Sequence, residues 1–306
     1  MKLLKALLVS TLAFTMVACS TTETKKEEPI KAIVPMGATS LSLLGLYEDK
    51  NVTIDTVDGS DTLSAEFNKK DGYDIIIAPI NLGSKLISTG KSEYVLDSVV
   101  TWGNLYVIGT DESALTTEGV FAAFGEAAVP QKVLMNSLDL TTITPSITYF
   151  NSVNDVQAQL LSGKANVGLL AEPAATATIA KAKEKGMELK VLKDLQKEYK
   201  AKNNTTKEGY PQAALFVKKG SEEKVATYLE TAKKFANETA IGDDTSVTKA
   251  VEKATVEKLG VPSAQIAQKT WARQNIKFVK ANTVKEDITA FLAQFKITLD
   301  DAYYGE

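Results

Sequence analysis

The stretch that decides the fold of this chain is Asp74-Ile75-Ile76-Ile77-Ala78-Pro79. Its apolar run is typical of a strand buried on both faces of a parallel sheet, and the proline that follows marks a turn into a helix. A second stretch, Asn166-Val167-Gly168-Leu169-Leu170-Ala171-Glu172-Pro173, has the same order of polar residue, apolar strand, alanine and proline turn. This echo indicates two similar lobes, although any unit of strand and helix can show it.

Short apolar runs alternate with helical patterns on both sides of these two stretches. The alternation predicts an α/β chain built on parallel sheets. The predicted strands cover residues 31–34, 52–57, 73–77, 95–102, 105–108, 120–124, 146–150, 167–170 and 213–217. After residue 217 we predict only amphipathic helices, at 222–236, 246–259, 263–275 and 284–295.

The chain begins with a pattern typical of a secretory signal. A basic start at 1–5 precedes an apolar run at 6–17, the small residue Ala18 and the only cysteine, Cys19. This order resembles the lipobox of bacterial lipoproteins, with Met16 where leucine is usual, and it implies that Cys19 is lipidated. A transmembrane anchor or a buried helix is the alternative, but the run is shorter than the ~20 residues that a spanning helix needs. We therefore predict a signal peptide at 1–18, a lipidated tether at 19–29 and an extracytoplasmic location on the membrane surface.

Composition excludes several kinds of chemistry. The chain has no histidine, which excludes Ser-His-Asp and Cys-His catalysis and imidazole-based metal sites. A calcium or magnesium site needs only oxygen ligands and stays open, although there is no EF-hand loop. No glycine-rich nucleotide loop occurs, and a formal charge of −3 argues against nucleic-acid binding. Because a single cysteine cannot form an intramolecular disulfide, the fold must rest on its core.

Four motifs, in this order, resemble those of the type II extracellular substrate-binding proteins of ABC importers, in their nitrate, sulfonate and thiamine-precursor branch. They are the strand-Pro-x-Gly turn at 35–37, the Asp-strand-Ala-Pro block at 74–79, the segment 163–173 and Gly-Tyr-Pro-Gln-Ala at 209–213. The resemblance runs from Ile30 to about the end of the chain, and Asn166 stands where the family usually has aspartate. It implies an α/β, two-lobed periplasmic-binding-protein type II fold with C-terminal helices, lobe one at 30–109 plus 212–306 and lobe two at 110–211.

The same resemblance implies a function. A ligand would be held in a cleft between the lobes, enclosed by hinge motion and passed to an ABC permease, with no cofactor and no chemistry required of the chain. The expected partners are a small-molecule solute, the transmembrane subunits of the permease and, through the lipid, the membrane; nucleic acid is not expected, and the chain is expected to be a monomer. A surface lipoprotein with an adhesion or structural role is one alternative, and an enzyme on the same bilobal fold is another.

Loops at the carboxyl ends of the predicted strands supply the candidate ligand-binding residues, since the crevice of an open α/β sheet lies at this edge. The candidates are Met36, Gly37, Thr39, Ser40, Ser60, Asp61, Asn81, Trp102, Asn104, Gly125, Tyr149, Asn151, Ser152 and Glu172. These loops offer mainly amides and hydroxyls, and Arg273, the only arginine, falls in the C-terminal helices outside the predicted cleft. We therefore expect a neutral or zwitterionic ligand, with a vitamin-precursor-like heterocycle favoured over a sulfonate- or nitrate-like anion.

Four of these candidates have two interpretations each. Trp102 could stack on a flat ligand or pack the hinge, and Tyr149 could touch ligand or point to the core. The carboxylates of Glu172 and Asp61 could accept hydrogen bonds from a ligand N–H group, or they could satisfy the backbone at the start of their own helices.

Overall fold

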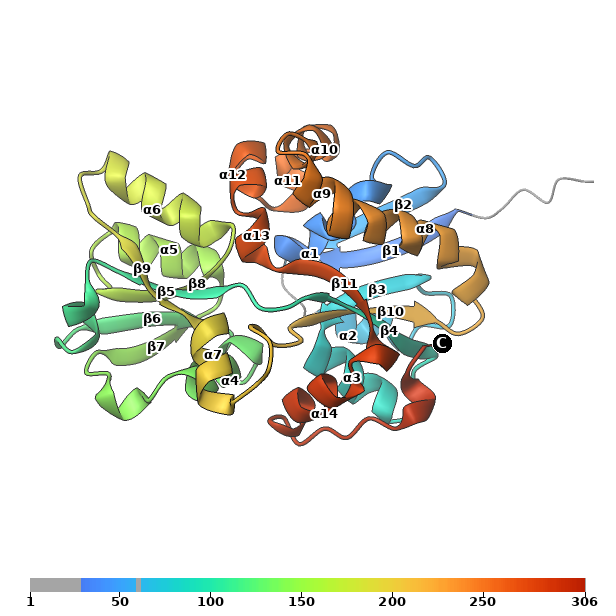
Figure 1. Ribbon diagram of the computed structural model, residues 1–306, viewed down its shortest axis with the longest axis horizontal. Coiled ribbons are helices and arrows are strands. Elements are labelled where there is room, and N and C mark those ends of the chain that lie inside the picture. The colour runs from blue at the N-terminus through green and yellow to red at the C-terminus, as the bar shows by residue number, and fades with distance from the viewer. Residues whose placement is uncertain (1–28, 59–61, 306) are drawn as a thin grey trace, which may run out of the picture.

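The computed structural model describes residues 29–58 and 62–305. The predicted signal peptide, Cys19 and the site candidates Ser60 and Asp61 lie outside the described residues. The described chain forms two sheets, each covered by helices, which lie side by side as two lobes (Figure 1).

Lobe one is built on a six-stranded mixed sheet. Its strands are β1 (Ile30–Pro35), β2 (Val52–Val57), β3 (Ile75–Pro79), β4 (Tyr94–Thr101), β10 (Ala213–Lys218) and β11 (Ile276–Lys280). Their order across the sheet is β11-β4-β10-β3-β1-β2. β1 pairs in parallel with β2 and β3, whereas β10 runs antiparallel to both β3 and β4, and β11 antiparallel to β4.

Lobe two is built on a five-stranded sheet with a matching arrangement. Its strands are β5 (Leu105–Gly109), β6 (Val120–Phe124), β7 (Ser146–Phe150), β8 (Val167–Ala171) and β9 (Lys190–Asp194). Their order is β7-β6-β8-β5-β9. β6 pairs in parallel with β7 and β8, and β5 runs antiparallel to β8 and β9. With β11 set aside, the two lobes therefore have the same strand order and the same directions.

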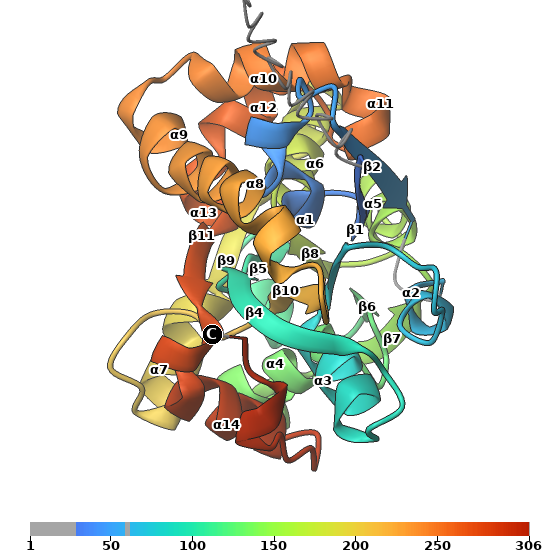
Figure 2. The same cartoon turned by 90° about the vertical axis from the view of Figure 1, so that its right-hand side faces the viewer.

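Helices cover both faces of each sheet, as the two perpendicular views show (Figures 1 and 2). One face of the lobe-one sheet packs against α1 (Ala38–Leu41), α8 (Glu222–Lys234), α9 (Ala240–Gly242), α10 (Ser246–Ala254), α11 (Val256–Leu259), α12 (Ala264–Lys269) and α13 (Trp271–Gln274). Its other face packs against the group α2 (Leu63–Glu66), α3 (Ile80–Ser88) and α14 (Lys285–Ala293). In lobe two, α5 (Val153–Leu161) and α6 (Ala174–Glu184) cover one face, and α4 (Val129–Ser137) and α7 (Leu195–Asn203) the other.

One apolar cluster continues from lobe to lobe. It joins the α3 and α14 side of lobe one to the α4 and α7 side of lobe two. At the junction, the ring of Tyr210 stacks on Phe291 of α14, with centroids 5.6 Å apart, and lies 5.1 Å from the ring of Tyr199 of α7. The lobes are therefore in apolar contact on this side of the molecule.

The echo noted in the sequence corresponds to equivalent strands, because β3 and β8 occupy the same place in their sheets. Asp74, just before β3, accepts a hydrogen bond at Oδ2 from the backbone N–H of Lys31 at 2.9 Å. Asn166, just before β8, accepts one at Oδ1 from the N–H of Val120 at 3.3 Å. A short polar side chain thus ties the start of β3 to β1 in lobe one and the start of β8 to β6 in lobe two.

Two expectations from the sequence need correction. The prediction that only helices follow residue 217 is wrong, because β11 adds an edge strand to the first sheet. Ile276 and Phe278 are buried and Lys277 is exposed, an alternation too short to stand out beside the helical pattern of 263–275. The predicted lobe boundary also placed residues 105–109 in lobe one, whereas β5 belongs to the second sheet, so the chain leaves the first sheet directly after Thr101.

The first testable prediction concerns Asp74. Burial alone would raise the pKa of its carboxyl, but hydrogen bonds from Lys31 N, Ser221 Oγ and Lys224 Nζ outweigh burial and hold the pKa below the ordinary 3.8. A lowered pKa means that the carboxylate stabilises the fold above the unfolded-state pKa and that this contribution is lost as the pH falls. Asp74→Asn should therefore lower the free energy of unfolding at pH 7 by about 1–3 kcal/mol. The deficit should shrink below pH ~4.

Urea unfolding at pH 7 and pH 3.5 measures both effects. The control is Asp244→Asn, which changes an exposed carboxylate without a hydrogen bond or ion pair in the described structure and should alter neither value. An Asp74→Asn deficit of equal size at both pH values would show that the charge of Asp74 is not what stabilises this corner of the sheet.

Candidate functional site

Two crossover segments join the lobes. The first links β4 to β5, and the second, which includes α7, links β9 to β10. They run beside each other, since Gln212 N donates to Thr101 O at 3.0 Å and Tyr210 N donates to Trp102 O at 3.3 Å. The side chain of Gln212 also pairs with Asn104: its Nε2 donates to Asn104 Oδ1 at 2.8 Å, and Asn104 N donates to its Oε1 at 3.2 Å.

Each crossover contains a glycine that no other residue could replace without strain. Gly103 and Gly209 both have φ at +92°, which L side chains rarely adopt. A Cβ at Gly209 would lie 2.1 Å from the carbonyl oxygen of Trp102, and one at Gly103 would lie 2.8 Å from the ring of Tyr210. The crossovers are therefore packed backbone to backbone, which holds them in register where the lobes meet.

A cavity of about 710 Å³ lies at this junction, lined by residues of both lobes and both crossovers. Its volume is in the range typical of small-molecule sites. The crossovers contribute Asn104 and Gln212, lobe one contributes residues 35–39 and much of 256–262, and lobe two contributes 151–154 and 171–174. The carboxyl ends of β1, β6 and β8 all open toward this space, as expected for the crevice of an open α/β sheet.

The two walls of the cavity differ in chemistry. The lobe-one wall is mainly apolar and includes Met36, Val256, Val261 and Pro262, and Met36 is one of the exposed large apolar side chains of the described structure, at 37%. The lobe-two wall presents Asn151, Ser152 and Asn154 beside the ring of Phe124, while the crossovers add amide groups. The cavity thus offers an apolar surface on one side and hydrogen-bonding groups on the other.

Charged side chains of the lining lie mostly at its exposed margin. Asp58 and Glu257 of lobe one and Lys181 of lobe two are exposed, and none of these three side chains has a hydrogen bond or ion pair in the described structure. The buried carboxylate of Glu172 is the exception, at 1% exposure for the residue. Among the described lining residues, Lys181 is the only cation.

The lobe-one wall is held in place by residues far apart in sequence. The carbonyl oxygen of Leu259, at the end of α11, accepts hydrogen bonds from Gly37 N and Ser40 Oγ, each at 2.8 Å. Met36 packs directly over Gly260, where a Cβ would lie 2.4 Å from that of Met36. The turn after β1 and the end of α11 therefore form one continuous surface.

The lobe-two wall is fixed by local capping. Ser152 and Asp155 form a capping box at the start of α5, with Asp155 N donating to Ser152 Oγ at 3.2 Å. Gln157, one turn later, donates to the carbonyl oxygen of Ala174 at 3.2 Å and to Thr178 Oγ1 at 2.7 Å, which joins α5 to α6. The side-chain amides of this wall thus lie just before or on α5, and Gln157 joins that helix to α6.

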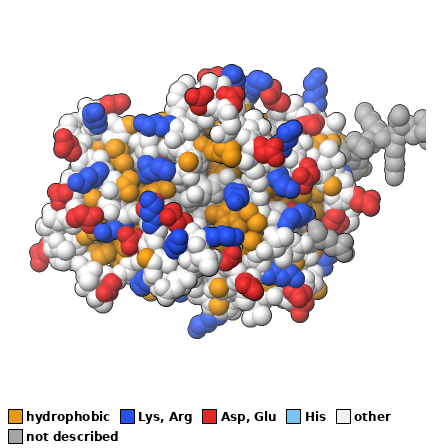
Figure 3. Space-filling model, viewed as in Figure 1, with side chains coloured by type: hydrophobic (Ala, Val, Ile, Leu, Met, Phe, Trp, Pro, Cys, Tyr) orange, Lys and Arg blue, Asp and Glu red, His pale blue; other side chains and the backbone are white. Residues whose placement is uncertain are grey.

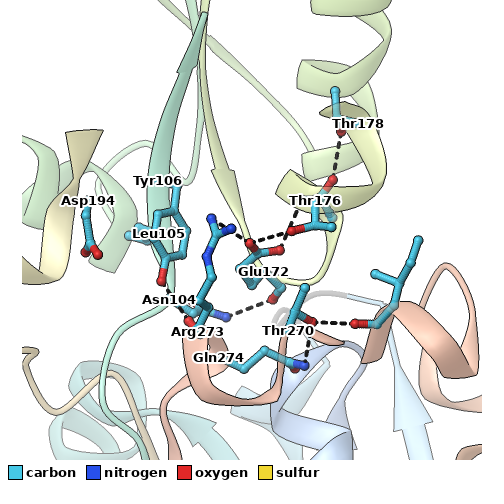
Figure 4. A network of polar contacts seen from close by, with 12 residues as sticks. Asn104, Leu105, Tyr106, Glu172, Thr176, Thr178, Asp194, Thr270, Arg273 and Gln274 are labelled. Atoms are coloured by element: carbon cyan, nitrogen blue, oxygen red, sulfur yellow. Dashed lines mark hydrogen bonds and ion pairs between the residues drawn. The ribbon is translucent and has the colours of Figure 1, made fainter. Parts of the chain in front are cut away.

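Glu172 joins the cavity to the C-terminal helices (Figure 4). Its carboxylate accepts hydrogen bonds from Thr176 N at 3.1 Å and Thr176 Oγ1 at 2.8 Å, so it satisfies the first turn of α6, as the second interpretation of this residue held. It also forms an ion pair with Arg273, with Glu172 Oε1 2.8 Å from Arg273 Nη2. Arg273 itself does not line the cavity, but the C-terminal helical region is not all outside it, since α13 reaches Glu172 and α11 lines the cavity.

The structure brings together seven of the candidates from the sequence. These seven line the cavity: Met36, Gly37, Thr39, Asn104, Asn151, Ser152 and Glu172.

Five other candidates do not line it: Ser40, Asn81, Trp102, Gly125 and Tyr149. The hydroxyl of Ser40 donates to the carbonyl oxygens of Gly37 and Leu259. The indole N–H of Trp102 donates to Lys277 O at 3.1 Å, so the indole of this crossover residue lies beside β11. Gly125 packs against the ring of Pro130, Tyr149 packs against the shared apolar cluster, and Asn81 lies in the first turn of α3.

Sequence reasoning missed much of the remaining lining, including Phe124, Gln157, Lys181, Gln212 and residues 256–262. Phe124 ends a predicted strand, and the rule used for the candidates could have included it. Gln212 precedes a strand, and it reaches the cavity because β10 runs antiparallel to β3. Lys181 and the end of α11 lie on helices, and no local pattern marks them as neighbours of the strand ends.

Within 29–58 and 62–305, no group of three or more Asp, Glu, Cys or His side chains is placed to hold a metal ion. In the same residues, no helix combines the length and the apolar character needed to cross a bilayer. On the face seen in Figure 3, acidic and basic side chains are interspersed rather than separated into patches of one sign.

Comparison with known proteins gives structural but not sequence neighbours. No family model and no curated protein sequence matches the chain. Solved structures do match: an ABC transporter protein from Parabacteroides distasonis superposes with a TM-score of 0.76 at 20% identity, covering 91% of this chain and 99% of that one. The periplasmic aliphatic sulphonate binding protein of Escherichia coli gives a TM-score of 0.59 at 13% identity, over 91% of this chain and 92% of its own.

A third match is an alkanesulfonate-binding protein from Xanthomonas axonopodis pv. citri bound to MOPS, with a TM-score of 0.55 at 16% identity, over 89% of this chain and 94% of its own. Together with the paired sheets and the cavity between them, these likenesses define the class: the chain has the two-lobed α/β fold of the periplasmic binding proteins of type II. Its structural neighbours are substrate-binding proteins of ABC transporters.

The second prediction tests the packing of the crossovers. Gly209→Ala should lower the free energy of unfolding by about 3 kcal/mol or more, because the new methyl group would meet the Trp102 carbonyl in addition to the strain of a positive φ. Gly186→Ala is the matched control, since it has φ at +73° and nothing within 4 Å of the added Cβ. Urea unfolding of both variants separates the two contributions, and equal losses would mean that the crossovers relax to admit the methyl group.

Proposed function

We propose that this protein is a lipid-anchored, extracytoplasmic substrate-binding protein that captures a small organic solute between its lobes and delivers it to an ABC permease. The observation that carries the proposal is the cavity of about 710 Å³ formed jointly by both lobes and both crossovers. A ligand that contacts both walls draws the lobes together, because it binds the closed arrangement better than the open one. The structural neighbours that bind sulfonates support the same role.

The lining supports a neutral or zwitterionic solute. A sulfonate or nitrate is usually met by an arginine fork or several N–H groups, whereas the cation of the described lining, Lys181, lies at the exposed margin. The apolar lobe-one wall suits the face of a flat molecule, and the amides opposite suit its polar edge. We therefore propose a heterocycle of the vitamin-precursor kind as the favoured solute and a sulfonate- or nitrate-like anion as the next.

We further propose that the seven candidates that line the cavity contact this solute. Cys19 would carry the lipid, and the polar residues that follow it would act as a flexible tether. Two acyl chains hold a protein on a membrane where one alone is marginal. In this proposal the chain itself performs no reaction, and a monomer is the working unit.

The third prediction is that a solute of this class stabilises the fold. A ligand that binds only the folded state adds about 2.7 kcal/mol when present at a hundred times its dissociation constant. A thermal-shift screen of the chain from Ser20 onward should include thiamine and its pyrimidine precursor, riboflavin, alkanesulfonates, nitrate and amino acids. One compound should raise the melting temperature strongly, and the heterocycles should rank above the anions.

Two methionines provide a matched test that the hit binds in the cavity. Met36→Gln, in the lobe-one wall, should weaken binding, whereas Met135→Gln, at an exposed site on α4 outside the cavity, should not. A ligand whose affinity is the same in both variants binds elsewhere. A panel with no hit, followed by native mass spectrometry that finds no co-purified molecule, would favour the adhesion or structural alternative; turnover of a compound would favour the enzyme.

The fourth prediction concerns the anchor. Cys19→Ser should move the protein from the membrane fraction to the soluble extracytoplasmic fraction, because no acyl chain can then be attached. Ser20→Ala is the control and should leave the protein on the membrane. Fractionation followed by immunoblotting measures both, and a Cys19→Ser protein that still sediments with membranes would rule out lipidation as the anchor.

A further inference from the structure

The guanidinium of Arg273 belongs to lobe one but is held by lobe two. Arg273 lies on α13, and its partners Tyr106 and Glu172 come from β5 and from the turn after β8 (Figure 4). Its Cζ lies 4.4 Å from the centroid of the Tyr106 ring, and its Nη2 lies 2.8 Å from Glu172 Oε1. The hydroxyl of Tyr106 in turn donates to the carbonyl oxygen of Arg273 at 2.9 Å. We call this set of three residues the clasp.

The clasp is costly to break because of the burial of Glu172. The side chain of Glu172 has 0% exposure, and a buried carboxylate without a counter-charge is strongly unfavourable. Thr176 supplies hydrogen bonds but no charge, so Arg273 is the cation that compensates the carboxylate. The Arg273 side chain as a whole keeps 41% exposure, and its guanidinium stacks on Tyr106, a geometry that the compact ammonium of lysine does not reproduce.

The residues that follow Arg273 bind the first crossover. Asn275 Nδ2 donates to Gly103 O at 2.7 Å, and Trp102 N donates to Asn275 O at 2.9 Å. The indole of Trp102 reaches Lys277 O in the same segment. The segment from α13 to the start of β11 is thus joined to lobe two and to a crossover without being a covalent connection between the lobes.

We propose that Arg273 is a positioning residue that acts as a third, non-covalent connection between the lobes and thereby sets the affinity for ligand. The two covalent crossovers are packed side by side, and the apolar cluster described above joins the lobes only on the side of α3, α14, α4 and α7. The clasp adds an attachment beside the cavity, since Glu172 lines it and Arg273 does not. Motion is then restricted to arrangements that keep Arg273 on Tyr106, and these keep the cavity walls facing each other.

This proposal rests on the proposed function. Its consequence for ligand affinity follows from the fraction of molecules that are in the binding-competent arrangement. The apparent dissociation constant equals the intrinsic one divided by the fraction of molecules in the binding-competent arrangement. If loss of the clasp lowers that fraction from nearly all to about one fifth, the apparent dissociation constant rises about fivefold. Arg273 itself does not line the cavity, so its removal deletes no direct contact between its own side chain and the ligand.

The test measures the distance between the lobes without any ligand. The chain from Ser20 onward contains every described residue and no cysteine, so spin labels can be placed at Glu252→Cys on α10 and Lys183→Cys on α6, both exposed. Pulsed electron spin resonance should give a narrow distribution of label-to-label distances in the labelled chain that keeps Arg273. In the labelled Arg273→Gln variant, the distribution should be broader and shifted to longer distances. Arg273→Lys, which keeps the charge but loses the stacked fork, should lie between the two. Lys277→Gln removes a nearby exposed cation, and its distance distribution should match that of the labelled chain with Arg273 and Lys277 unchanged.

The outcomes separate the clasp from the receptor role. Identical distributions for Arg273 and Arg273→Gln would overturn the proposal. If Arg273→Gln fails to fold, Arg273→Lys and Tyr106→Phe replace it as test variants. Tyr106→Phe removes only the hydroxyl that donates to the Arg273 carbonyl oxygen. Unchanged distance distributions in both variants would also overturn the proposal. With a ligand from the thermal-shift screen, Arg273→Gln should bind about fivefold more weakly. A screen without hits and native mass spectrometry without a co-purified molecule, together with a broadened distance distribution, would contradict the receptor role and leave the proposal on the clasp intact.

Discussion

The strand of each sheet that follows a crossover and runs antiparallel to both its neighbours is the constraint on which the rest of the structure depends. β10 separates β3 from β4 in one lobe, and β5 separates β8 from β9 in the other. Each of these strands enters its sheet from a crossover, so neither sheet can be completed unless the chain passes between the lobes. The two crossovers must therefore meet at one place, and the pairing of Asn104 with Gln212 marks it. The cavity lies at this place because the carboxyl ends of the parallel strands face it.

The fold could be predicted well from the sequence because its signals are local and repeated. The apolar runs at 75–77 and 167–170 are long enough to identify buried strands. Asp74 and Asn166, just before them, each accept a hydrogen bond from a backbone N–H of the neighbouring strand. The order of these signals, together with the resemblance to substrate-binding proteins, led to the two-lobed fold that the structure shows. The strand β11 was not predicted from the sequence, because this edge strand buries only alternate residues at its start and its five residues follow a much stronger helical pattern.

The candidate site could be predicted only in part. The rule that ligands bind at the carboxyl ends of strands identified Met36, Asn104 and Glu172, but it also selected Asn81 and Tyr149. The rule gives the edge of the sheet and not the direction in which a side chain leaves it, and these two residues lie outside the cavity lining. The contacts of Arg273 and of the end of α11 join residues about a hundred or more positions apart, and a single sequence carries no local pattern for such pairs.

The place of β10 in the sheet also sets the order in which the lobes can be completed. All strands of the second sheet lie in one continuous stretch, from Leu105 to Asp194, whereas β3 and β4 of the first sheet share no hydrogen bonds and wait for β10. A chain made from its amino terminus therefore has the whole of the second sheet available before residue 213 exists. Until then, β3 and β4, which are almost entirely buried in the folded protein, have unpaired edges, which is the condition under which β-structure aggregates. The lobe whose synthesis begins first is thus the lobe whose sheet can be completed last, and its exposed strand edges need protection until Ala213 has emerged.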